Sequence, residues 1–166
     1  MSDMADDEAL ILEKWGSWDA LYTGLERLAN ELCPVICGHD APAPRVQVKP
    51  TWLARGLLGG QHTGADYEPA EREQPAVIGL FPSVLTDDSL LRRVVAHELV
   101  HHWENLGAAG AHELPSPDGA AAIISARFRD SQRERSWRSG HSASFISKAS
   151  SVAATLGVPL REMLFS

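Results

Sequence analysis

Two histidines four residues apart, with a glutamate beside the first, are the residues of this sequence best placed to do chemistry. The segment reads His97-Glu98-Leu99-Val100-His101. Residues four apart lie on the same face of an α-helix, so both imidazoles can reach one ion. Glu98 then lies about 100° round the helix, where its carboxylate can act as a general base on a water at the metal. The spacing predicts the metal site of a zinc hydrolase.

The residues around this motif are apolar over most of a helical circumference, which predicts a buried helix. They are Leu90, Leu91, Val94, Val95, Leu99, Val100, Trp103 and Leu106. Two histidines and a glutamate in such a place are costly unless they have partners. The alternative is a pair of core histidines satisfied by hydrogen bonds, but spacing and burial together favour a metal site.

A catalytic zinc ion usually has three protein ligands, so His97 and His101 need a third. Position 107, where the extended form of the motif has another histidine, is glycine. The candidates are His141, Glu113, His112 and Glu134. We favour His141, because it stands behind Gly140 at the start of a predicted helix and on the apolar stripe of that helix.

Upstream of the motif, apolar residues recur at helical spacing from about Asp7 to Leu32, where Pro34 is expected to end the helix. Residues 1–7 are acidic and polar and are expected to be a disordered tail. Eight acidic and two basic residues lie within residues 1–31, so most of the net charge of −7 belongs to this region.

The middle of the chain predicts a hairpin or small β-sheet packed on the motif helix. Arg45–Lys49 alternates as a half-buried strand does, and Ala76–Phe81 is an apolar run typical of a buried strand. Residues 52–75, rich in glycine, proline and charge, are expected to be a long loop.

The motif helix itself is expected over about Ser89–Leu106, with N-capping oxygens before it and Gly107 as a stop. Further helices are expected over Ala120–Trp137, His141–Leu156 and Leu160–Leu164. The whole chain of 166 residues, 44% of them hydrophobic, is therefore predicted to be one mostly helical α+β domain.

No basic and apolar leader opens the chain and no apolar run approaches the roughly 20 residues that span a bilayer. We expect a cytoplasmic protein without a membrane segment. Cys33 and Cys37 are expected to be free, partly buried thiols. The oligomeric state cannot be read from the chain.

These motifs, in this order, resemble the SprT-like zinc metalloprotease domain of the Spartan/SprT family. The resemblance rests on the buried strand Val77–Phe81, the His-Glu-x-x-His helix followed by Trp103, and the later segment Gly140-His141-Ser142-Ala143-Ser144-Phe145. It implies a zincin-like core with one catalytic Zn²⁺, held by His97, His101 and His141, and Glu98 as the general base. The four-cysteine zinc ribbon that many members carry is not part of this sequence, which has no cysteine after Cys37.

Motif and resemblance together predict a zinc-dependent endopeptidase with a protein or peptide substrate. The family's Spartan-like branch cleaves proteins crosslinked to DNA, with DNA-binding segments that are not recognisable here. Arg133, Arg135 and Arg138 precede His141; they are either a rim that guides DNA or an acidic substrate, or a solvated helix face. Two other functions stay open, namely hydrolysis of non-peptide amides and a non-catalytic, zinc-stabilised binding module.

Two further roles concern the residues around the metal. Sites of this kind usually have an additional donor for the oxyanion, and Tyr67, His62 and Arg138 are candidates among which the sequence does not choose. His102, next to a ligand, is expected to face away from the metal and to make a structural hydrogen bond, or else to support a ligand from behind.

Overall fold

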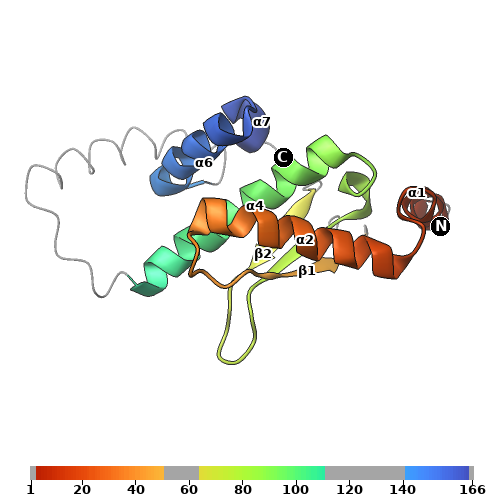
Figure 1. The fold of residues 1–166 in the computed structure, drawn as a ribbon, viewed down its shortest axis with the longest axis horizontal. Helices are drawn as coiled ribbons and strands as arrows, with labels where there is room; N and C mark the ends of the chain where they lie inside the picture. Colours follow the sequence, from red (N-terminus) through yellow and green to blue (C-terminus); the bar gives the residue numbers. More distant parts are fainter. Residues whose placement is uncertain (1–2, 51–63, 111–140, 165–166) are drawn as a thin grey trace, which may run out of the picture.

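The computed structural model describes residues 3–50, 64–110 and 141–164, which are mostly helical with one three-stranded sheet (Figure 1). This confirms the expected α+β class with its small sheet. The elements, in chain order, are α1 (Asp3–Trp15), α2 (Trp18–Cys37), β1 (Arg45–Val48), β2 (Ala65–Glu68), β3 (Val77–Leu80), the short 3-10 helix η1 (Pro82–Val84), α4 (Asp88–Gly110), α6 (Ala143–Leu156) and α7 (Leu160–Leu164).

The single N-terminal helix predicted from the apolar spacing is wrong, because two helices occupy that region. Gly16, with a positive φ of 81°, lets the chain turn, and the Ser17 side chain accepts the Ala20 N–H to cap the start of α2. Helix α1 begins at Asp3, within the stretch expected to be a disordered tail. Pro34 lies inside α2 and does not end it.

The sheet has the order β1-β3-β2, with β1 parallel and β2 antiparallel to the central strand. The two strands expected from the sequence are therefore neighbours, and they form a sheet and not a hairpin. Strand β2 lies inside the predicted long loop over 52–75, so that prediction is wrong for residues 65–68. Its alternation is short and has Ala65 at its one fully buried position, which is too weak a pattern to stand out among glycines and prolines.

Gly79 on the central strand makes room for an ion pair that crosses the outer face of the sheet. Lys49 extends from the end of β1 over Gly79 and pairs with Asp66 and Glu68 on β2. A Cβ atom at position 79 would lie 2.2 Å from Asp66 Oδ1 and 2.6 Å from Lys49 Cε. The glycine is thus required by the packing of its neighbours and not by its own backbone angles.

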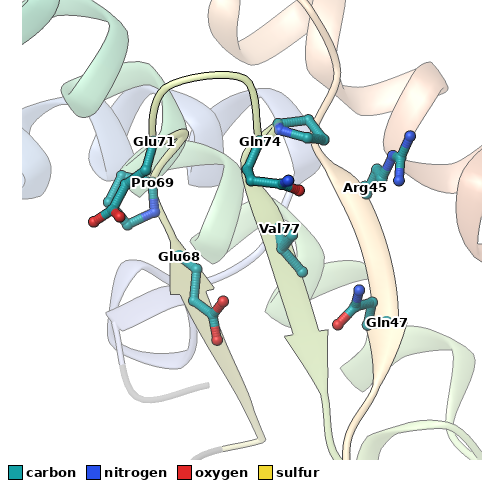
Figure 2. A pocket seen from close by; sticks show the side chains of 8 residues that line it. Arg45, Gln47, Glu68, Pro69, Glu71, Gln74 and Val77 are labelled. Carbon is teal, nitrogen blue, oxygen red and sulfur yellow. The ribbon is translucent and has the colours of Figure 1, made fainter.

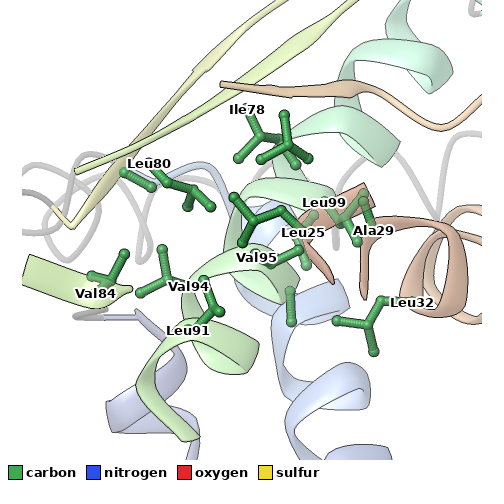
Figure 3. Close-up of a cluster of buried hydrophobic side chains, with 14 of the residues drawn as sticks. Leu25, Ala29, Leu32, Ile78, Leu80, Val84, Leu91, Val94, Val95 and Leu99 are labelled. Atoms are coloured by element: carbon green, nitrogen blue, oxygen red, sulfur yellow. The ribbon is translucent and has the colours of Figure 1, made fainter. Parts of the chain in front are cut away.

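The core forms where α2, α4 and the inner face of the sheet meet. Figure 3 shows Leu25 of α2 and Ile78 of β3 directed toward Val95 and Leu99 of α4. Helices α6 and α7 pack on another side of α4 (Figure 1). Because α4 has neighbours on several sides, His97 and Glu98 of the motif are buried and His101 is half-buried.

The ends of the two helices that carry the motif residues differ in part from expectation. Asp87 accepts the Leu90 N–H and caps α4 as predicted, but the helix continues through Gly107 to Gly110. The later helix begins at Ala143 and not at His141, with Ser142 as its N-cap, and ends at Leu156 as expected, with Gly157 as its C-cap. The helix predicted over 120–137 lies outside the described residues.

Candidate metal centre

Three histidines from two separate parts of the chain converge beside α4. His97 and His101 lie one turn apart on α4, and His141 comes from the segment just before α6. Their ring centroids are 4.9–5.3 Å apart, and one possible ligand atom from each lies within 4.8 Å of the others. All three residues predicted as ligands are therefore brought together in an arrangement that could hold a metal ion.

The spacing of two nitrogens in this cluster and the neutral state of its imidazoles both suit a metal ion. The Nε2 atoms of His97 and His141 are 3.2 Å apart, and two nitrogens bound tetrahedrally to one zinc ion at its usual bond length are about 3.3 Å apart. Burial, with a smaller effect of His97 and His141, lowers the pKa of His101 to about 3. Burial, with a smaller effect of His97, lowers the pKa of His141 to about 4. Neutral imidazole is the form that binds a metal.

His97 is oriented by a backbone group near the end of the chain. Its Nδ1 lies 2.6 Å from the carbonyl oxygen of Met163 in α7. A carbonyl only accepts, so Nδ1 carries the proton and the lone pair of Nε2 faces the cluster. Sequence reasoning missed this partner, because a backbone carbonyl has no signature in the residue types.

The ring of Phe145 packs beside all three ligand rings. It lies 4.2 Å from that of His141 at 16°, 4.3 Å from that of His101 and 5.0 Å from that of His97, between centroids. Phe145 is fully buried. The sequence placed it one turn after His141 on the apolar stripe of α6, but did not assign it to the metal centre.

Glu98, the predicted general base, is 5% exposed. Burial raises the pKa of its carboxyl to about 8, and the negative charge of Asp66 on β2 adds to this effect. A cation beside a carboxylate favours its ionised form. A metal ion held by the three histidines would therefore oppose the effect of burial on Glu98.

Tyr67, one of the candidate oxyanion donors, has its hydroxyl engaged elsewhere. His102 Nε2 lies 2.7 Å from the carbonyl oxygen of Pro42, so this nitrogen donates. Burial lowers the pKa of His102 and keeps it neutral, which leaves its Nδ1 to accept the Tyr67 hydroxyl proton at 2.9 Å. This supports the structural role expected for His102, and it engages the one proton that Tyr67 could donate to an oxyanion.

The two cysteines are free, as expected. The Cys37 thiol donates to the Leu99 carbonyl at 3.3 Å and so joins α2 to α4. Burial raises the pKa of Cys37 to about 12. A thiol in this state is a packing group and not a nucleophile.

A polar groove of about 540 Å³ lies apart from the histidines, on the outer face of the sheet and at the turn between β2 and β3 (Figure 2). It is lined by Arg45, Gln47, Glu68, Pro69, Glu71, Gln74, Pro75 and Val77. The histidine cluster lies beside α4, which packs against the inner face.

Several predicted residues lie outside the described part of the chain. These are the alternative ligands His112, Glu113 and Glu134, the candidate donors His62 and Arg138, and the arginines of the expected rim, Arg133, Arg135 and Arg138. In the described ranges, no helix is both long enough and apolar enough to span a bilayer.

No protein-family model, curated protein or solved structure matches this chain. The resemblance to SprT-like domains therefore rests on the motif residues and their order alone.

Proposed function

We propose that this protein is a zinc-dependent metallopeptidase with a zincin-like core of the SprT type. The convergence of His97, His101 and His141 carries this proposal, because the fold brings His141 to the other two from a position 40 residues after His101. Three neutral nitrogen ligands suit zinc and leave a fourth position for the reaction. A glutamate next to the first ligand supports catalysis over a purely structural site, which usually has four protein ligands.

Each residue of the centre has a defined task in this proposal. Zinc, when bound, would supply a Lewis acid that activates water and polarises the scissile carbonyl. Glu98 takes the proton of the attacking water on a carboxylate oxygen and passes it to the nitrogen of the leaving amine. His97 stays in the required tautomer because Met163 accepts its Nδ1 proton.

The substrate in this proposal is a protein or peptide. The small sheet supports it, because β2 lies against α4 and places backbone beside the ligands, with the ring of Tyr67 stacked on that of His101. Association with DNA depends on arginines outside the described residues and stays a prediction from the sequence.

The test is to measure zinc and peptide cleavage on the same protein preparations. We expect about one equivalent of zinc in the wild-type protein, retention of zinc with loss of cleavage in Glu98→Gln, and loss of zinc in His141→Ala. Absence of zinc from the wild-type protein would overturn the proposal. Turnover of small amides without any peptide product would favour the amidase, and retained zinc without hydrolysis of either would favour the binding module.

A further inference from the structure

A metal-binding histidine is usually oriented by a second hydrogen bond, and no described residue supplies one to His141. Within the described residues, its Nδ1 is buried and has no hydrogen-bond partner, whereas the Nδ1 of His97 donates to Met163. Stacking on Phe145 fixes the plane of the His141 ring but not its position along α4. Another contact must set that position.

Glu104 supplies such a contact from α4 itself. It lies three residues after His101 and seven after His97, so all three side chains share one face of the helix. One carboxylate oxygen of Glu104, Oε1, accepts hydrogen bonds from the hydroxyls of both Ser142 and Ser144. The residue next to His141 is therefore bound directly to the helix that carries the other two ligands.

The hydrogen bonds of Ser142 show how this contact reaches the start of α6. Its hydroxyl oxygen accepts the Phe145 N–H at 3.1 Å as the N-cap, while its single proton goes to Glu104. The carboxylate thus lies at the N-terminus of α6, where the helix dipole favours a negative charge.

We propose that Glu104 is a positioning residue that holds His141 in register with His97 and His101. This inference rests on the proposed metal centre and adds a residue that the motif does not contain. Glu104 accepts both serine hydrogen bonds on one oxygen, so a glutamine, which keeps that oxygen, should still position His141. Removing the acceptor frees both serine hydroxyls and leaves His141, among its described contacts, positioned by ring packing and by the packing of α6 on α4.

The experiment measures the zinc dissociation constant of full-length variants by competition with a chromophoric chelator. We expect Glu104→Ala to weaken zinc binding about 10- to 100-fold, as loss of an orienting partner does, and Glu104→Gln to stay within about threefold of wild type because it retains Oε1. Ser144→Ala removes one of the two donors and should show an intermediate loss. Ser147→Ala, on an exposed position of α6, is the matched control and should change nothing.

The outcomes separate this inference from the proposed function. Unchanged zinc affinity in Glu104→Ala overturns it, and equal losses in Glu104→Ala and Glu104→Gln also overturn it, because charge and not the bond would then matter. The NMR signals of the His141 ring in chelator-treated protein give a second readout. These signals should shift in Glu104→Ala and not in Ser147→Ala. This readout does not need zinc, so it still tests the inference if the wild-type protein binds no zinc and the proposed function fails.

Discussion

Tyr67 lies beside the ligands, with its ring stacked on that of His101, but its hydroxyl proton is bound to His102. Tyr67→Phe keeps the ring and leaves Nδ1 of His102 without its donor. We expect the free energy of unfolding to fall by about 1 kcal/mol. We also expect kcat/KM for peptide cleavage to stay within about twofold of wild type, since the phenol proton is already donated to His102. Urea denaturation and steady-state kinetics measure the two effects.

Tyr22→Phe provides the control, because Tyr22 is 37% exposed on α2 and its hydroxyl should contribute little to stability. A hundredfold loss of kcat in Tyr67→Phe at unchanged stability would instead assign the phenol to the oxyanion.

Individual residues of the candidate site were predictable to the extent that side-chain chemistry marked them. The four-residue spacing marks His97 and His101, and the need for a third ligand leads to His141. Phe145, Glu104 and the carbonyl of Met163 were not predictable as part of the site. Their roles arise only when α6 and α7 pack on α4, and sequence spacing carries no information about that packing.

At the level of helices, the substitution of glycine by alanine can be compared at a crowded position, Gly24, and at an open one, Gly107. A Cβ at Gly24 in α2 would lie 2.4 Å from Cζ3 of Trp15, whereas a Cβ at Gly107 in α4 would have nothing within 4 Å. The indole of Trp15 is held in place because its Nε1 donates to the Leu85 carbonyl at 2.9 Å. Gly24 therefore allows α1 to pack closely on α2, while Gly107 is only a weak helix former.

We expect Gly107→Ala to raise the free energy of unfolding by up to about 1 kcal/mol through helix propensity. Gly24→Ala should lower it by about 1–3 kcal/mol, because overpacking against Trp15 outweighs the same gain in propensity. Urea denaturation of both variants beside wild type measures the difference. A destabilised Gly107→Ala would show that α4 ends near Leu106 after all, and a stabilised Gly24→Ala would show that α1 does not dock as described.

The helix boundaries that the sequence mispredicted also lie at glycine and proline residues. The apolar spacing continues from Trp15 to Trp18 although the chain turns at Gly16, so the pattern alone cannot show the break. Proline in the last turn of α2 costs a backbone hydrogen bond and glycine in the last turns of α4 costs helix propensity, and packing outweighs both costs. The strands β1 and β3 and the cap of α4 at Asp87 were easier to predict, because each depends on local chemistry or a compact apolar run.

Across the whole molecule, the centre is assembled from three distant parts of the chain. Helix α4 supplies two ligands, the segment before α6 supplies the third, and α7 supplies the acceptor for His97. An ion pair between Arg93 and Glu162 also joins α7 to α4. Metal affinity should therefore depend on how α7 packs, although α7 carries none of the predicted ligands.

Met163→Ala tests this dependence against Leu21→Ala, since both side chains are fully buried and only Met163 belongs to α7. Each truncation should lower the free energy of unfolding by about 2–5 kcal/mol. Only Met163→Ala shifts the carbonyl that orients His97, so only this variant should weaken zinc binding, by about tenfold or more. The zinc dissociation constants are compared at a temperature at which both metal-free variants remain folded by circular dichroism. Equal affinities would mean that the ring of His97 keeps its orientation without α7, and the centre would then depend on α4 and α6 alone.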